Sequence, residues 1–248
     1  ACGPAVIGQY GGHSGAGATK NEDGALVWAA GGGGPADWEL ALVLDAHATA
    51  ESAALVLDAV EAEYEAIAAI LAGSVEGFAS KLERRFVGLF GSAGFRARCA
   101  QVQGETACLI VVRKGRFLWW FSVGDCVLYL FHPDLARLGQ YALNQRQFFE
   151  WLGRVHTFNL PAPCYSSGTR ELRTGHNVIL LTTDGLLECG AQPFADPVKL
   201  AALFTGTDDI DTSVHDALAQ VHDERGADSA TLIAWRYDNR EEAAQPSL

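Results

Sequence analysis

Four aspartates stand at or near one end of an apolar run in this sequence. They occur in Leu42-Val43-Leu44-Asp45, Ser122-Val123-Gly124-Asp125, Thr182-Thr183-Asp184 and Asp228-Ser229-Ala230. A single aspartate in such a place is usually a turn cap, because its carboxylate accepts hydrogen bonds from nearby backbone N–H groups. Four of them indicate more, since carboxylates that a buried sheet brings to one edge repel one another unless a cation lies among them. Ligand sets made only of oxygen favour Mg²⁺ or Mn²⁺ over Zn²⁺.

His47 lies two residues after Asp45, just before a long helical pattern. Taken alone, it is typical of a solvated residue at a helix start. Beside a metal cluster it is a candidate general acid, because an ordinary histidine pKa of about 6.5 suits proton transfer at neutral pH.

Two other kinds of site find little support in the spacing of the residues. The glycine-rich start resembles a phosphate-binding P-loop, but Ala18 stands where that loop needs its lysine, and Lys20 comes two residues late. No cysteine has neighbours that would lower its thiol pKa, so a Cys/His nucleophile is not indicated.

The composition excludes several function classes. Among 248 residues, 18 basic and 30 acidic side chains give a net charge of −12, whereas a nucleic-acid binder needs an excess of Lys and Arg. The six cysteines form no C-x-x-C pair, which favours a reduced cytoplasmic protein over a disulfide framework. No apolar run approaches the ~18 residues of a membrane helix, and the start shows no signal-peptide pattern.

Short apolar runs predict most of the strands. The run Leu40–Leu44 is continuous, which is typical of a strand buried on both faces. The Gly-containing connection at 113–116 predicts a hairpin, and Val127–Phe131 is expected to extend it into a meander. Strands are predicted at Ala25–Ala30, Leu40–Leu44, Ala107–Val112, Phe117–Val123, Val127–Phe131, Val178–Thr183 and Ala230–Tyr237.

Two segments have the apolar period of a helix. Residues 49–72 carry apolar side chains at i, i+3, i+4 and i+7, with Thr49 as a plausible N-cap and Gly73 as a stop, so one long helix is predicted there. A weaker pattern covers Val75 to Phe90.

The remaining chain is expected to connect these elements within one mixed domain over residues 1–238. Residues 132–177 are punctuated by prolines and are predicted to be an irregular, flap-like insertion with a helix near Asn144–Leu152. The run Asn144-Gln145-Arg146-Gln147-Phe148-Phe149 pairs polar groups with aromatic rings, which favours a substrate-side flap; the alternative is that Phe148, Phe149 and Trp151 only pack the segment against the domain. Residues 239–248 are predicted to be a polar, frayed tail.

Six segments, in order, resemble the motifs of one protein family. The chain resembles the metal-dependent Ser/Thr protein phosphatases of type 2C, the PPM family, in their smaller bacterial form. Each segment is weak alone, but the shared order and spacing make a strong signal. The segments are Asn21-Glu22-Asp23, Asp45-Ala46-His47, Gly104-Glu105-Thr106-Ala107, Val123-Gly124-Asp125-Cys126, Leu181-Thr182-Thr183-Asp184-Gly185-Leu186 and Gly226-Ala227-Asp228-Ser229-Ala230-Thr231.

This resemblance implies an α+β fold, a four-layer α-β-β-α sandwich of two antiparallel sheets flanked by helices. It also implies two Mn²⁺ or Mg²⁺ ions at one end of the sandwich. Carried over by position, Asp45 would bridge both ions, the Ala46 carbonyl would bind one, and Asp184 and Asp228 would bind the other. Asp125 would help to hold a third, looser ion, while Glu22 and Asp23 would orient metal-bound waters.

The chemistry implied is hydrolysis of phosphoserine or phosphothreonine in proteins. Two cations lower the pKa of a water that attacks phosphorus and offset the charge on the phosphoryl oxygens. His47 would protonate the departing oxygen. The expected partner is a phosphorylated protein, opposing a Ser/Thr kinase, and the expected state is a monomer, with neither nucleic acid nor membrane bound.

The sequence also departs from the family pattern. Asp-Ala-His-Ala replaces Asp-Gly-His-Gly, and a strained backbone at Ala46 would cost about 1–3 kcal/mol. Ala18 stands where the phosphate-anchoring arginine is expected, so Lys20, Arg170 or Arg173 is predicted to take part of that role. A lysine grips phosphate less well than the bidentate arginine fork.

Two alternatives stay open from these departures. The chain could be a pseudophosphatase that binds a phosphoprotein or regulator without turnover. It could also hydrolyse small phosphate esters, although its acidic surface disfavours strongly anionic substrates.

Overall fold

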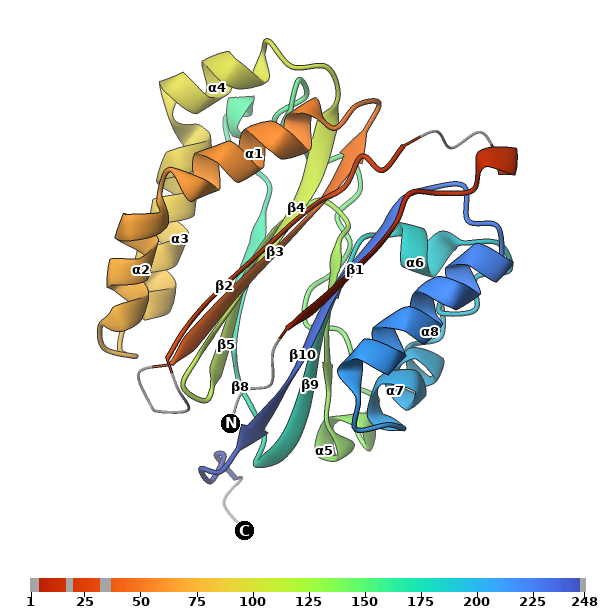
Figure 1. Ribbon diagram of the computed structural model, residues 1–248. Coiled ribbons are helices and arrows are strands. Elements are labelled where there is room, and N and C mark those ends of the chain that lie inside the picture. Colours follow the sequence, from red (N-terminus) through yellow and green to blue (C-terminus); the bar gives the residue numbers. More distant parts are fainter. Residues whose placement is uncertain (1–4, 17–19, 32–36, 246–248) are drawn as a thin grey trace.

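Two antiparallel sheets pack face to face in the computed structural model, which describes residues 5–16, 20–31 and 37–245 (Figure 1). The four-stranded sheet has the order β1-β10-β9-β6, with β1 (Val6–Tyr10), β10 (Ala230–Asn239), β9 (Gly175–Thr182) and β6 (Val127–Phe131). The larger sheet has the order β2-β3-β4-β5-β8, and β7 pairs with β4. Its strands are β2 (Gly24–Ala30), β3 (Trp38–His47), β4 (Glu105–Lys114), β5 (Phe117–Val123), β7 (Leu152–Gly153) and β8 (Ser166–Glu171).

Helices cover the outer face of each sheet, so the expected four-layer α-β-β-α sandwich is confirmed (Figure 1). The larger sheet is covered by α1 (Glu51–Glu61), α2 (Tyr64–Ala72), α3 (Phe78–Gly91) and α4 (Ala93–Cys99). The four-stranded sheet is covered by α6 (Gly185–Glu188), α7 (Pro197–Thr205) and α8 (Ile210–Asp223). A further short helix, α5 (Pro133–Ala136), follows β6. None of the helices in the described ranges has the length and apolar character that a bilayer span requires.

The apolar core lies in three layers because the central strands are buried on both faces. Between the sheets, Val43 and Leu109 of the larger sheet share one cluster with Ile179 and Trp235 of the smaller one. Alternate residues of the same strands, such as Leu42, pack outward against the helices. This double burial agrees with the continuous apolar run predicted at Leu40–Leu44, whose residues are at most 1% exposed.

The predicted meander is correct for β4 and β5 but wrong for β6. Strand β6 crosses to the other sheet, where Val127 to Phe131 pair with Thr182 to Val178 of β9. The redirection occurs at Gly124, whose φ of +90° is a left-handed conformation that favours glycine. An apolar run reports burial and does not specify which sheet a strand joins, so the sequence pattern missed this crossing.

The single helix predicted at 49–72 is two helices, α1 and α2, separated by Ala62 and Glu63. Both residues keep nearly helical backbone angles, so the apolar period continues across the break and hides it. Thr49 accepts a hydrogen bond from the Glu51 N–H, close to the predicted cap.

The segment 132–177 contains more sheet and less helix than predicted. The helix expected at Asn144–Leu152 is absent from the structure. Asn144 uses its side chain to bond the backbone of Leu128 and Cys126 instead, and the Gln147 N–H donates to the Gly124 carbonyl. Strand β8 was missed because an edge strand of sequence Ser-Ser-Gly-Thr-Arg-Glu has no apolar run.

The end of the chain is more ordered than the predicted frayed tail. Strand β10 continues to Asn239, which is 1% exposed and donates from its side chain to the Leu172 carbonyl. The Ala244 N–H donates to Glu171, and Arg173 donates to the Ala244 carbonyl. The tail is therefore held against β8 and the start of β9 at least as far as Ala244.

Candidate metal centre

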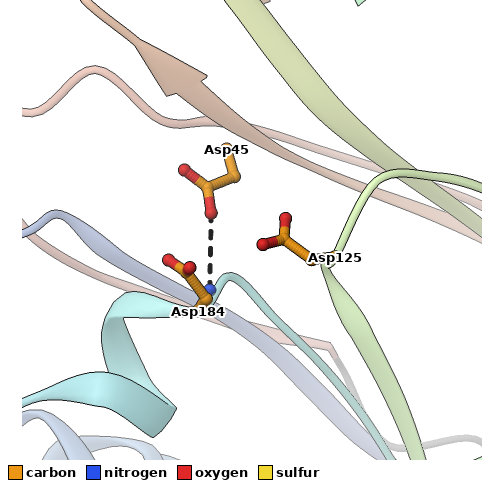
Figure 2. A group of neighbouring side chains, drawn as sticks. All are labelled: Asp45, Asp125 and Asp184. Atoms are coloured by element: carbon orange, nitrogen blue, oxygen red, sulfur yellow. Dashed lines mark hydrogen bonds between the residues drawn. The ribbon is translucent and has the colours of Figure 1, made fainter. Parts of the chain in front are cut away.

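Three aspartates from different elements converge at one end of the two sheets. Asp45 lies near the end of β3, Asp125 follows the turn after β5, and Asp184 comes two residues after β9. Figure 2 shows their carboxylates directed toward one another. One carboxylate oxygen from each lies within 4.8 Å of the others, so the three groups could share a cation.

Burial and mutual repulsion define the electrostatics of this cluster. Asp45 is 1% exposed and Asp125 8%. Burial, followed by the charge of Asp23, raises the pKa of Asp45 to about 7. Burial, followed by the charges of Asp45 and Asp125, raises the pKa of Asp184 to about 8. Without a cation, the protein therefore disfavours the charged form of these carboxyl groups.

Hydrogen bonds hold the backbone around Asp45. The Thr106 hydroxyl donates to the Asp45 carbonyl over 3.0 Å, and the Asp184 N–H donates to Asp45 Oδ2 over 3.4 Å (Figure 2). Two elements on either side of the cluster are thus tied to the same aspartate, so its carboxylate is fixed before any ligand binds.

Two buried carboxylate oxygens in this region have no hydrogen-bond partner within residues 5–16, 20–31 and 37–245. They are Oδ1 of Asp125 and Oδ1 of Asp23. Buried oxygens are normally hydrogen-bonded, because leaving one unpaired costs about 1–3 kcal/mol. A divalent cation would satisfy such oxygens, and the all-oxygen donor set matches the preference of Mg²⁺ and Mn²⁺. The residues present therefore fit a divalent metal.

Asp23 lies close enough to the cluster for its charge to act on Asp45, and it is hydrogen-bonded to Thr183, the residue before Asp184. Its Oδ2 accepts a hydrogen bond from the Thr183 hydroxyl over 3.0 Å, and that hydroxyl accepts one from the Thr231 N–H. Burial raises the pKa of Asp23 to about 7, although the bonds from Thr231 and Thr183 oppose the shift. Thr183 was quoted only as part of a motif, and its role in fixing Asp23 was missed.

Glu22 and Asp228 lie at the edge of the cluster. The Glu22 N–H donates to the Ser229 hydroxyl, which links the segment 21–23 to the start of β10. Asp228 is exposed and is not one of the three convergent aspartates. Its charge nevertheless raises the pKa of Asp23 and of Asp45, which places it near both.

The backbone strain expected at Ala46 occurs instead at Ala48, two residues further along the chain. His47 ends β3 and is half-buried, and its imidazole has no hydrogen-bond partner among the described residues. Ala46 is a buried residue within β3, so the strain predicted for it does not arise. The left-handed residue is Ala48, with φ of 72°.

Among the described residues, none of the basic side chains expected to replace the missing arginine forms an ion pair with the three aspartates. Lys20 is about half exposed and pairs with Glu22 over 2.8 Å. Arg170 donates to Gln140, and Arg173 donates to the Ala244 carbonyl. Residue 18 lies outside the described residues.

Arg146 is the basic residue that reaches the cluster, and it was not predicted to do so. Its Nη2 atom lies 3.0 Å from Asp184 Oδ2 and 3.3 Å from Asp125 Oδ2. It also contacts Glu188 over 2.7 Å. The signal available in the sequence was the grouping of Arg146 with amides and aromatic residues directly after the Asp125 hairpin.

Arg146 and Glu188 also line a cavity of about 360 Å³ beside the cluster. Tyr129, Asn144 and Phe194 form part of its wall. Arg146 therefore contacts both the carboxylate cluster and a space that could receive part of a ligand.

Several solved structures that superpose on this chain are bacterial phosphatases. A variant of a bacterial serine phosphatase superposes with a TM-score of 0.71 at 15% identity, covering 95% of this chain and 98% of that one. The Ser/Thr phosphatase Stp1 from Staphylococcus aureus gives 0.67 at 14% identity, covering 94% of each chain. The PPM Ser-Thr phosphatase MsPP from Mycobacterium smegmatis, in complex with cacodylate, gives 0.58 at 16%, covering 94% and 97%.

No family model matches the chain, and no curated protein is a significant match to it in sequence. The structural likeness therefore establishes the fold, which is that of the bacterial PPM-type Ser/Thr phosphatases.

Proposed function

We propose that this protein is a metal-dependent phosphatase that hydrolyses phosphoserine and phosphothreonine in proteins. The observation that carries the proposal is the convergence of Asp45, Asp125 and Asp184 at one end of a PPM-type sandwich. The raised pKa values of Asp45 and Asp184 support a metal role for these two carboxylates, because a cation would stabilise their charged forms.

The residues of the chain have separate roles in this proposal. Two Mn²⁺ or Mg²⁺ ions, when bound, supply an activated water and offset phosphoryl charge. Asp45 would hold both ions. The Ala46 carbonyl would help to hold one of them, and Asp184 and Asp228 would help to hold the other.

The remaining polar residues of the site act on water and on the leaving group. Glu22 and Asp23 orient water, and Thr183 keeps Asp23 in place through its hydroxyl bond. His47 protonates the departing serine or threonine oxygen, for which its imidazole is available because none of the described residues bonds to it.

The proposed substrate is a phosphorylated protein whose Ser/Thr kinase this enzyme opposes, and the proposed enzyme is a monomer. Stp1 and MsPP are both Ser/Thr phosphatases by name, which supports this substrate class. We place the enzyme in the cytoplasm because Cys99, Cys108 and Cys126 are buried free thiols, as is usual in reducing compartments.

A pseudophosphatase is the second candidate, favoured by the state of Lys20. Its ammonium is exposed and paired with Glu22, so it offers phosphate only a partly neutralised point charge. On this reading the fold binds a phosphoprotein with little turnover, even at saturating Mn²⁺.

Phosphate release from a phosphothreonine peptide, with Mn²⁺ and with EDTA, tests the proposal. We expect activity that requires the metal and falls at least about 100-fold in Asp45→Asn, because removing a ligand should cost no less than removing an outer partner. The control is Asp58→Asn, an exposed carboxylate on α1, which should keep full activity. A wild-type enzyme silent at millimolar Mn²⁺ would favour the pseudophosphatase.

A further inference from the structure

The guanidinium of Arg146 lies between two of the three convergent carboxylates. A single atom, Nη2, is 3.0 Å from Asp184 Oδ2 and 3.3 Å from Asp125 Oδ2. The same atom is 2.7 Å from Glu188 Oε1. Arg146 thus makes a bridging contact to Asp125 and Asp184, in the place where a cation shared by those two aspartates would lie.

The chain on either side of Arg146 is fixed to the turn that carries Asp125. The Asn144 side chain accepts from the Leu128 N–H and donates to the Cys126 carbonyl. On the other side, the Gln147 N–H donates to the Gly124 carbonyl over 3.0 Å. Asn144 is 7% exposed, so this anchor is buried. The backbone of Arg146 is therefore held in register with the aspartate that it contacts.

The side chain of Arg146 is also held from its solvent side. Its guanidinium lies over the Phe148 ring, 4.8 Å from the ring centroid, and the side chain is only 23% exposed. Such a contact stabilises the cation and limits its rotamers. Arg146 is thus built into the site, unlike an exposed surface arginine.

The guanidinium of Arg146 and a metal ion cannot both occupy the space between Asp125 and Asp184, because they would overlap and both carry positive charge. Divalent ions bind carboxylate oxygens at about 2.0–2.2 Å, so an ion joining Asp125 to Asp184 would occupy the space that Nη2 fills. An arginine is charged at every physiological pH, and unlike an ion it cannot be removed by a chelator. It can therefore offset the repulsion between the two carboxylates permanently.

We propose that Arg146 fills the cation position between Asp125 and Asp184, so that this chain binds two divalent ions and uses a side chain where a third ion would bind. The inference rests on the proposed function, because it assumes a two-ion centre around Asp45. It assigns Arg146 as a positioning residue that keeps Asp125 and Asp184 in place at any metal concentration.

Counting bound Mn²⁺ tests the assignment independently of turnover. Equilibrium dialysis to millimolar Mn²⁺, with free ion measured by electron paramagnetic resonance, should give about two ions per wild-type chain. Arg146→Gln should bind about three, because removing the guanidinium opens the position. A double variant that adds Asp125→Asn should return to about two.

The matched control is Arg170→Gln, which removes an arginine of β8 that donates to Gln140, and it should leave the count at about two. Three ions on the wild-type chain would overturn the proposal, even if Arg146→Gln failed to fold. Two ions on a folded Arg146→Gln chain would also overturn it. A wild-type chain that binds no Mn²⁺ would contradict the proposed function itself.

Discussion

At Asp45, burial of the side chain opposes ionisation of the carboxyl group. Its carboxylate is almost fully buried, and burial, with the nearby Asp23, raises its pKa to about 7. In the unfolded chain the same group titrates near 4. The folded, metal-free protein therefore binds a proton at Asp45 that the unfolded chain has already lost above pH ~4.

The first prediction concerns the stability of the metal-free protein as a function of pH. The pKa of Asp45 is higher in the folded protein than in the unfolded chain. Its protonated carboxyl group therefore adds to the free energy of unfolding below pH ~4, and this contribution is lost as the pH rises to about 7. Asp45→Asn does not titrate, so its stability relative to wild type should improve by about 4 kcal/mol between pH ~4 and ~8. Thermal melts in EDTA would show this as a relative gain of roughly 8–16 °C. A difference that stays constant with pH would contradict the raised pKa.

Ala46 and Ala48 give a second prediction, in which two similar changes have opposite signs. Ala48 is exposed with φ of 72°, a conformation that costs a non-glycine residue about 1–2 kcal/mol. Ala48→Gly should therefore raise stability by up to about 1 kcal/mol. Ala46 is buried within β3, so Ala46→Gly should lower stability by about 1 kcal/mol. Denaturant unfolding measures both changes in the free energy of unfolding. If both variants gain or both lose stability, the strained residue is not Ala48.

At the scale of elements, the turn between β5 and β6 does most to place the ligands. It moves the chain from one sheet to the other within a few residues and sets Asp125 at their shared end. Gly124 makes this possible with φ of +90° and a close approach to Ala107.

The third prediction compares two glycines with positive φ. A Cβ at Gly124 would lie 2.5 Å from the Ala107 Cβ and 3.0 Å from the Glu150 carbonyl oxygen. Gly124→Ala should lower the free energy of unfolding by about 3 kcal/mol, because the turn must shift. Gly139 has φ of +66° with no atom within 4 Å of its Cβ position, so Gly139→Ala should cost only about 1 kcal/mol. Denaturant unfolding measures both losses, and equal losses would show that the turn at Gly124 is not sterically constrained.

The elements also show where sequence patterns stop being informative. Val127–Phe131 was predicted with its observed bounds, yet its sheet was wrong, because burial is local and strand pairing is not. Strand β8 was invisible because an edge strand is half-buried and can be polar. The helix predicted at Asn144–Leu152 fails because Asn144 and Gln147 find hydrogen-bond partners on another segment.

At the scale of the whole molecule, the candidate site draws residues from both sheets. Asp45 belongs to a strand of the larger sheet, and Asp184 follows a strand of the smaller one. Asp125 lies on the connection between the sheets. A metal held by Asp45 and Asp184 would therefore link the two sheets.

The fourth prediction is that Mn²⁺ stabilises the whole fold. A ligand at 100 times its Kd that binds only the native state adds about 2.7 kcal/mol. For a chain of this length we expect the Tm to rise by roughly 5–10 °C, and to continue rising with Mn²⁺ concentration. Asp45→Asn should lose this rise, whereas Asp58→Asn should keep it. An equal rise in both variants would place the bound Mn²⁺ elsewhere.

Local patterns in the sequence predict the central strands, the helical residues within 49–72 and 75–90, and the aspartates at the strand ends. These follow from local patterns, because a buried strand must be apolar and its end must change to polar residues. The tertiary structure alone decided that β6 joins the second sheet, that β8 closes the edge of the first, and that Arg146 reaches Asp125 and Asp184. Each of these depends on contacts between segments distant in the chain or on the direction of one turn, and the identity of a residue does not encode its distant partner.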